Sequence, residues 1–483
     1  MTPADLAGLS SDEKDALICS LFERVAALEA VVLKQQAIIA ELQARLAADS
    51  HNSNKPPSSD GFRKPPKPKS LRQQSGKKSG GQPGHPGSNL TRSDHPDCVV
   101  VHAPPKICDA CDAFLPEPIL AEVRQVFDLP EIRYEVTEHR VLQAACRCGK
   151  LHRGLFPSEV SAPVQYGPKT FAAMVYLTNH HMLPVQRTAA LVNDFFGLPV
   201  CEATVLSACA NAEARLAPTV DAIAASFQTA PVAHADETGV NIGGSLHWMH
   251  VLVTPLLTWI GYHKKRGKEA MIALGILPAF CGILVHDGWE SYRSFLCGHS
   301  LCNAHHLREL VYLFEELQQS WAGRMIELLR AAAHEVNQAA EMVLGDERRV
   351  WYRASYDAIL CDGERDHPRA EASGRRGRTK QSKATNLLSR LREHADDVWR
   401  FASDPNVPFT NNLAERDVRM PKVKQKISGG FRTAHGTKTF CVIRSYLATM
   451  HKQGANLFDA LSLAFQGNVP QPRFTHDGGI ATR

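Results

Sequence analysis

Three acidic residues that are far apart in the sequence constrain the fold of this chain more than any other feature. Asp236 and Asp287 each end an apolar stretch typical of a buried strand. Glu415 begins a predicted helix behind polar capping residues at 410–412, with Arg419 one turn later on the same face. Converging carboxylates repel one another, so we expect them to meet only around divalent cations. Two strand aspartates and one helix glutamate are what a two-metal phosphoryl-transfer site needs.

The hydrophobic pattern around the two aspartates has the period of a sheet. We predict four strands and one helix, the strands at 231–236, 246–253, 256–262 and 282–286 and the helix at 268–277. Three antiparallel strands, a crossover helix and a parallel strand are the order of a ribonuclease H-like fold. In that order the first and fourth strands are neighbours, so Asp236 and Asp287 can meet at one metal pair.

Polar residues beside the three acids are expected to have lesser roles. His234 and His286 flank the aspartates, and we interpret both as orienting or packing residues rather than ligands. Three further acids are expected to be exposed in loops or on helices: Glu237, Glu290 and Asp417. Pro421 should end the glutamate helix before Lys422, which would remove a basic residue two turns after Glu415.

The interval between Asp287 and Glu415 is far longer than such a fold needs. It has the pattern of long helices at 307–340 and 384–401 around a basic loop at 374–380. We interpret it as an inserted helical subdomain whose loop faces phosphates. At 302–308, a Cys-x-x-His spacing could bind a metal, but without a second pair we favour a structural role beside the active site.

The first fifty residues are predicted to form one helix with an apolar seam at alternating steps of three and four. The seam consists of Ile18, Leu21, Val25, Leu28, Val32, Gln35, Ile39, Leu42 and Leu46. This pattern favours a parallel two-stranded coiled coil, in which Gln35 is a polar break that could fix the register. The alternative is an amphipathic helix packed on its own domain.

A tract rich in Pro, Ser, Lys and Gly follows the helix. The net charge of the chain is only +5, but residues 55–78 contain eight Lys and Arg residues against the single acid Asp60. Such a segment cannot bury enough apolar surface to fold alone. It is either a solvated linker or an arm that contacts DNA phosphates.

Two cysteine pairs suggest a structural zinc site. Cys108 and Cys111 have the ideal spacing for zinc, whereas Cys146 and Cys148 are one residue closer together than usual. Residues 123–143 between the pairs have a strand pattern, as a zinc ribbon would require. Other possible ligands are Cys98, His102, His139 and His152. The alternative is four ordinary cytosolic cysteines. The 13 cysteines of the chain are scattered or paired at metal-like spacings, which suggests a reducing cytosol rather than a disulfide framework.

Residues 168–228 are helical in pattern, and within them 187–208 is similar to a helix-turn-helix, with a turn at 197–199. Any helical bundle contains such turns, so a DNA-contacting role is one of two interpretations. No secretory signal is visible, and the longest apolar stretch, 249–262, is interrupted by Pro255. These features predict a soluble cytoplasmic protein without a membrane segment.

The motifs together resemble bacterial transposases of the insertion sequence 66 family. The resemblance covers nearly the whole chain. It rests on the N-terminal zipper, the tract at 52–61, the cysteine pairs, Cys-x-Ala-His-x-x-Arg at 302–308, and Asn-Asn-x-Ala-Glu-Arg-x-x-Arg at 411–419. The last two motifs follow Asp-Glu-Thr at 236–238 and Asp-Gly-Trp at 287–289. It implies a DDE transposase with Asp236, Asp287 and Glu415 as the metal-binding triad. The shortened second cysteine pair departs from the family pattern.

The resemblance also implies the reaction and its partners. Two Mg²⁺ ions, for which Mn²⁺ can substitute, would activate water or a DNA 3′-hydroxyl, while Arg419 would contact the scissile phosphate or neutralise Glu415. The partners would be double-stranded DNA (the terminal inverted repeats of the element and the target), a second copy of the chain in a homodimer or larger oligomer, and accessory proteins of the element. Two alternatives remain: a non-transposing nuclease of the same fold, and a DNA-binding regulator with a vestigial catalytic domain.

The predicted fold class is therefore multidomain α+β. Its segments are a coiled coil (1–50), a basic linker (51–95), a zinc-ribbon-like domain (96–152), a helical DNA-binding region (153–229), a ribonuclease H-like catalytic core (230–300 and 404–450), a helical insertion (301–403) and a C-terminal segment (451–483).

Overall fold

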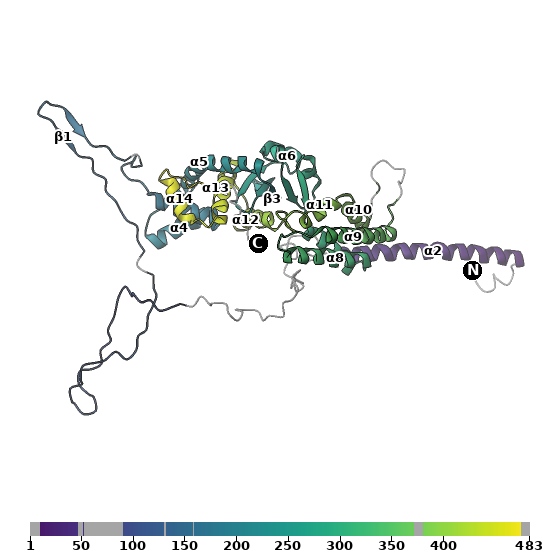
Figure 1. Ribbon diagram of the computed structural model, residues 1–483, viewed down its shortest axis with the longest axis horizontal. Coiled ribbons are helices and arrows are strands. Elements are labelled where there is room, and N and C mark those ends of the chain that lie inside the picture. The colour runs from purple at the N-terminus through teal and green to yellow at the C-terminus, as the bar shows by residue number, and fades with distance from the viewer. Residues whose placement is uncertain are drawn as a thin grey trace.

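The computed structural model describes residues 10–46, 52, 90–129, 132–157, 159–370, 379 and 381–474 (Figure 1). The N-terminal helix α2, Ser11–Leu46, extends beyond the rest of the molecule and confirms the predicted helix. Its seam residues, among them Val25, Val32 and Leu42, are about half exposed. The helix therefore does not bury its seam on its own chain, and pairing with a second copy stays a prediction. No helix among the described residues is long and apolar enough to cross a membrane. The predicted linker lies outside the described residues, except for Asn52 and 90–95.

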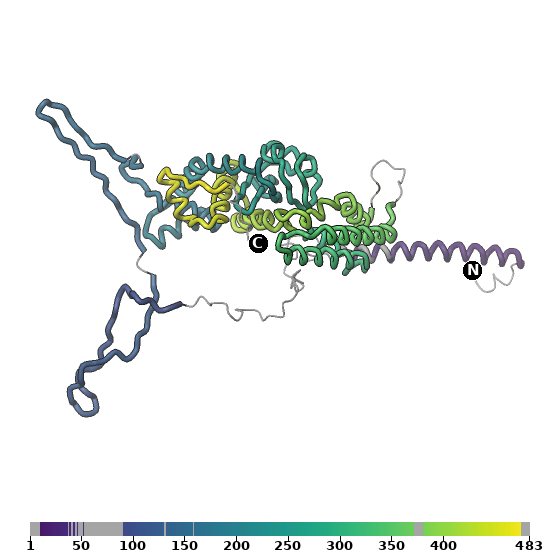
Figure 2. Tube along the Cα trace, viewed as in Figure 1, coloured from purple at the N-terminus to yellow at the C-terminus, as the bar shows by residue number. Residues whose placement is uncertain are grey.

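Residues 90–129 and 132–157 are extended, and Figure 2 shows them as two separate loops. Strands β1, Gln143–Ala145, and β2, Leu151–Arg153, form a short antiparallel hairpin. The prediction of strand over residues 123–143 is wrong for the described part of that range, except at the start of β1. Side chains there, such as Val126 and Val136, are mostly exposed, so no apolar face holds them against a partner strand.

Helices at both ends of the folded region pack into one helical layer. Its members are α3 (Pro168–Val175), the π-helix η2 (Tyr176–His180), α4 (Val185–Phe196), α5 (Glu202–Ser226), the 3₁₀ helix η3 (Phe227–Thr229), α13 (Ala434–Lys452) and α14 (Leu457–Phe465). The turn between α4 and α5 begins at Gly197, whose φ of +66° favours glycine. These helices confirm the predicted helical pattern. Ala208, Ala212 and Leu216 of α5 are buried in the shared core, so that face of the helix is not free to enter a DNA groove.

A five-stranded mixed sheet forms the centre of the molecule, in the order β5-β4-β3-β6-β7. Its strands are β3 (Val232–Ile242), β4 (Ser245–Val253), β5 (Thr258–His263), β6 (Ile283–His286) and β7 (Gly298–Leu301). The first three are antiparallel, and β3, β6 and β7 are parallel. The crossover between β5 and β6 contains α6 (Lys268–Leu274) and the 3₁₀ helix η4 (Leu277–Ala279).

Two features of the sheet differ from the predictions. β3 continues beyond Asp236 to Ile242, because its antiparallel pairing with β4 continues to Ser245. β7 was not predicted, since four residues including Gly298 and two polar side chains carry little strand signal. β7 adds a second parallel neighbour to the strand that precedes Asp287.

Helices cover both faces of the sheet. One face packs on α12 (Asn412–Ser428), on α13 and on the helices of the insertion. The other face packs on α6, on the end of α5 and on the 3₁₀ helix η5 (Glu290–Ser294). Because successive side chains of a strand point to opposite faces, even-numbered residues of β3 face α12 and odd-numbered residues face α6.

The insertion is helical, as predicted, but its helices are shorter. They are α7 (Asn303–Glu315), α8 (Ser320–Gln338), α9 (Asp346–Asp366), α10 (Lys383–Glu393), α11 (Ala395–Trp399) and the 3₁₀ helix η6 (Arg400–Ala402). Gln318, with φ +53°, separates α7 from α8. The helices share one core with Val232, Val285 and Leu301 of the sheet. The predicted basic loop at 374–380 lies outside the described residues, apart from Thr379.

Helix α12 does not end at Pro421, contrary to the prediction. Pro421 and Val418 are buried, so packing on the sheet and neighbouring helices holds the helix together despite the missing N–H. The helix ends only at Gly429, whose φ is +74°. Lys422 is therefore helical, and its Nζ donates to the carbonyl oxygen of Gly239 at 3.1 Å.

Candidate active site

The two aspartates lie at the same level on neighbouring parallel strands. In the register of β3 and β6, His234 is opposite Val285, and Asp236 and Asp287 each follow two residues later. Carboxyl ends of parallel strands meet at one edge of a sheet, which is where ligands bind in open α/β sheets. Asp236 therefore lies in the middle of β3, where the strand leaves the parallel pair, and Asp287 directly follows β6.

Asn411 anchors the start of α12, and so Glu415, to the strand that carries Asp236. Its side-chain amide donates to the carbonyl oxygen of Ala235 at 2.8 Å, and its Oδ1 is 2.9 Å from Nδ1 of His234. We expected the polar residues at 410–412 to cap α12, but the Asn411 side chain makes no capping hydrogen bond. It bonds to the strand instead, because it is buried between the helix and the sheet.

Burial and neighbouring carboxylates both act on the charge of Asp236. Burial raises the pKa of Asp236 well above its usual range, and the carboxylates of Glu237, Asp287 and Glu415 raise it further. Oε1 of Glu415 is buried without a hydrogen-bond partner. A desolvated carboxylate cluster with an unpaired oxygen is the donor set that hard divalent cations bind.

Cationic and ligating groups approach Glu415 from the start of α7. Nδ1 of His305 and a guanidinium nitrogen of Arg308 are each 4.0 Å from the Glu415 carboxylate. Burial lowers the pKa of His305, as does Arg308. One ligand atom each from Cys302, His305 and Glu415 lies within 4.8 Å of the others. The segment at 302–308 therefore contacts Glu415, which agrees with its predicted place beside the active site. The Cys-x-x-His spacing was the sequence signal for the ligand atoms of this segment.

Cys302 also helps to fix the start of α12. The backbone N–H of Asn411 donates to its Sγ at 3.1 Å, and the thiol is fully buried. Burial raises the pKa of Cys302 to about 11. Arg419, in contrast, is exposed and takes part in none of the ion pairs among the described residues.

Two of the three acids expected to be exposed are largely shielded from solvent and paired. The side chain of Glu237 is 2% exposed, forms an ion pair with Arg266 at 2.6 Å and accepts a hydrogen bond from Tyr292. Asp417 accepts from Lys452 at 2.9 Å and from Thr258 at 2.7 Å. Sequence alone did not reveal these partners because they come from distant elements. Only Glu290 is exposed, as expected.

Glu237 supports the site from the other face of the sheet. Arg266 lies between the rings of Trp248 and Trp289, 4.8 Å and 4.1 Å from their centroids. The backbone N–H of Trp289 donates to Oδ1 of Asp287 at 2.8 Å. Arg266 thus links the strand of one aspartate to the loop of the other.

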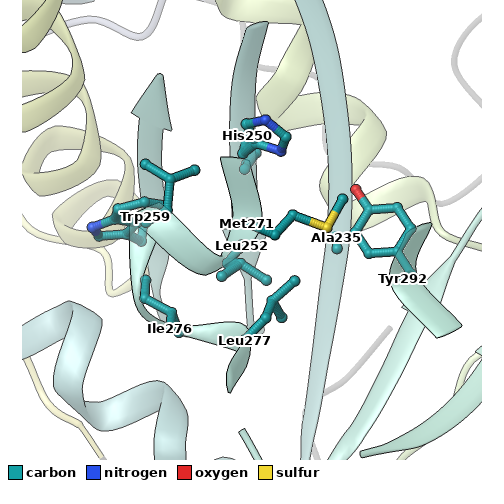
Figure 3. Close-up of a pocket in the computed structure, with 10 residues that line it drawn as sticks. Ala235, His250, Leu252, Trp259, Met271, Ile276, Leu277 and Tyr292 are labelled. Carbon is teal, nitrogen blue, oxygen red and sulfur yellow. The ribbon is translucent and has the colours of Figure 1, made fainter. Parts of the chain in front are cut away.

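A cavity lies on that face, apart from the carboxylates. Figure 3 shows apolar side chains around it, including Leu252, Met271 and Leu277, together with His250 and Tyr292. Nε2 of His250 is buried there without a partner. Because Asp236 points to the opposite face, this cavity is not part of the carboxylate site.

Each cysteine pair of the extended region is formed on its own turn. The N–H of Asp112 donates to the carbonyl oxygen of Cys108, and that of Gly149 to the carbonyl oxygen of Cys146. Backbone N–H groups and the second thiol of each pair lower the pKa of Cys108 and of Cys146. Four thiols suit zinc chemically. Among the described residues, however, the two pairs do not meet at one point.

Comparison with known families agrees with this organisation. Residues 163–439 match the model described as "Transposase IS66 family", and residues 105–149 match "zinc-finger binding domain of transposase IS66". Residues 1–91 match a family of unknown function. None of the individually curated proteins matches the chain significantly.

Fold and site define a multidomain α+β protein with a mixed sheet, partly buried acidic residues at its edge and a cysteine-rich segment typical of a structural zinc site. The transposase match covers more than half of the 483 residues. The chain belongs to the IS66 family of transposases.

Proposed function

We propose that this protein is a DDE transposase that cleaves DNA at the ends of an insertion sequence and transfers the strands to a target, with Asp236, Asp287 and Glu415 as its metal-binding triad. The observation that carries the proposal is the convergence of these acids. Asp236 and Asp287 are level in the strand register, Glu415 is tied to the same strand by Asn411, and both other acids raise the pKa of Asp236. The strand order β5-β4-β3-β6-β7 supports a ribonuclease H-like core.

The three acids have the chemistry that suits two Mg²⁺ or Mn²⁺ ions. Asp236, Asp287 and Glu415 would hold them, and the unpaired, buried Oε1 of Glu415 is one oxygen free to do so. When bound, the ions would lower the pKa of an attacking water or 3′-hydroxyl and stabilise the charge that develops on the phosphate.

The side chains around the acids would orient the reacting groups. Asn411 would keep Glu415 beside β3, and Trp289 would hold the Asp287 carboxylate through its N–H. Arg308, whose side chain is one-third exposed beside Glu415, is better placed than Arg419 to contact a phosphate at this carboxylate. We retain Arg419 as an exposed DNA contact one turn along the helix.

We assign supporting roles to the other segments along the predicted domain boundaries. The Cys108–Cys111 and Cys146–Cys148 turns would form one structural zinc site when zinc draws the two loops together. Residues 153–229 and the basic linker would bind DNA, and α2 would pair two chains at two element ends.

The test replaces each acid of the triad by its amide. Asp236→Asn, Asp287→Asn and Glu415→Gln should each abolish cleavage and strand transfer on a plasmid with the element's own ends. They should retain binding to end DNA in gel-shift assays, because affinity comes from dispersed Lys and Arg contacts. The matched control is Glu290→Gln, since Glu290 is an exposed acid near Asp287. Normal cleavage by Glu415→Gln in Mg²⁺ would refute the assignment.

A further inference from the structure

A sulfur, a nitrogen and an oxygen ligand converge at the start of α7. Cys302 immediately precedes α7, and His305 lies in its first turn, where its N–H donates to the carbonyl oxygen of Cys302 at 3.2 Å. Glu415 approaches from α12, and one ligand atom of each residue lies within 4.8 Å of the other two. In the described part of the chain, this is the one group of at least three His, Cys, Asp or Glu residues whose ligand atoms could hold a metal ion.

Two of these ligand atoms have no partner. Nδ1 of His305 and Oε1 of Glu415 are both buried without a hydrogen bond, 4.0 Å apart. Two ligands at about 2.0 Å from a tetrahedral ion are roughly 3.3 Å apart, so a shift of about 0.7 Å would bring both onto one ion. Buried polar atoms without partners are costly, and a bound cation would satisfy both.

The donor set differs from that of the carboxylate site. Mg²⁺ prefers oxygen ligands, whereas a thiolate and an imidazole select ions such as Zn²⁺ and Co²⁺. Three protein ligands with a fourth position open are the usual pattern of an accessible zinc site.

We propose that Cys302, His305 and Glu415 form a second metal site, which takes a zinc-class transition metal. Binding replaces the Cys302 S–H bond by a sulfur–metal bond, and the proton leaves to solvent. The Asn411 N–H, already directed at the sulfur, stabilises the thiolate that results.

The site shares Glu415 with the triad, and this consequence rests on the proposed function. An ion held by Cys302 and His305 draws the Glu415 carboxylate toward α7 and away from the aspartates. Micromolar Zn²⁺ should therefore inhibit Mg²⁺-dependent cleavage by wild-type protein and do so less in His305→Gln.

Cobalt gives a readout that does not depend on activity. The full-length protein is titrated with Co²⁺, and absorption from tetrahedral Co²⁺ and from thiolate-to-cobalt charge transfer is recorded. The cysteines of the predicted zinc finger would also bind cobalt. The titration is therefore made in a Cys108→Ser/Cys111→Ser background, so that this site alone is observed. A second titration of the chain without these two substitutions gives the total number of cobalt ions bound. Cys302→Ser and His305→Gln should each bind one fewer cobalt ion per chain.

The matched control is Cys441→Ser, because Cys441 is also buried but belongs to α13 and lies outside this cluster. Equal cobalt binding by the wild type, Cys302→Ser and Cys441→Ser would overturn the proposal. His305→Gln serves as the second variant if Cys302→Ser does not fold, since Nδ1 of His305 has no hydrogen bond to lose. Asp236→Asn and Asp287→Asn leave all three ligands of this site in place, so they should bind cobalt like the wild type whether or not they are inactive in cleavage. Their cobalt binding tests this site and their cleavage tests the proposed function, so the two can fail separately.

Discussion

Replacing Asn411 by alanine should destabilise the protein and weaken catalysis together. The Asn411 side chain is 1% exposed and makes two hydrogen bonds, to the carbonyl oxygen of Ala235 and to His234. Each hydrogen bond contributes about 1 kcal/mol net, and a buried partner left unsatisfied costs about 1–3 kcal/mol. We therefore expect the variant to lose about 2–4 kcal/mol of unfolding free energy.

The chain offers a matched control in the next residue. Asn412 is exposed, so Asn412→Ala should change stability by no more than about 0.5 kcal/mol. Urea unfolding followed by tryptophan fluorescence measures the difference, because Trp248 and Trp289 lie beside the aspartate strands. If Asn411→Ala is no less stable than Asn412→Ala, the anchoring role of Asn411 is wrong.

Catalysis gives a second test of the same anchor. If Asn411→Ala misplaces Glu415, the Mg²⁺ concentration needed for half-maximal cleavage should rise. If Asn411 has a purely structural role, the variant would contain less active enzyme, but that Mg²⁺ concentration would not change. Asn411→Asp keeps an oxygen for His234 but loses the donor to Ala235. It also adds a buried carboxylate beside the other acids, so it should be no more stable than the alanine variant.

Three further predictions concern other parts of the chain. Deleting residues 1–48 should reduce the assembly to a smaller species in light scattering, and an unchanged mass would place the interface elsewhere. Cys108→Ser/Cys111→Ser should lose the structural zinc measured by elemental analysis; zinc retained in full would refute these ligands. Burial lowers the pKa of His250 to about 4. Between pH 6.5 and pH 4 only the unfolded state therefore binds a proton at His250, and the free energy of unfolding should fall by about 3 kcal/mol as the pH is lowered through this range. His250→Phe should flatten this part of the pH profile, and an unaltered slope would contradict the role of His250.

The sequence predicted the elements that local patterns specify. The period of apolar residues was sufficient for α2, for the helices of the insertion, and for β3 to β6 around the two aspartates. The pattern was not sufficient where contacts with other elements determine the structure. Pairing with β4 extends β3, and pairing with β6 forms β7. Helix α12 continues through Pro421 because that residue is buried. The strand pattern at 123–143 had no such neighbour and gave no strand in the described part.

The acids of the candidate site could be selected from the sequence because each ends or begins an element with a clear pattern. Their surroundings could not, since Asn411, Cys302 and His305 reach Glu415 and β3 across intervals of about a hundred residues or more. The same holds for Glu237. The sequence predicts an exposed acid there, because its partners Arg266 and Tyr292 come from other parts of the chain. Residue type and local period fix which side chains can do chemistry, but their partners, burial and pKa values depend on contacts that only the folded chain makes.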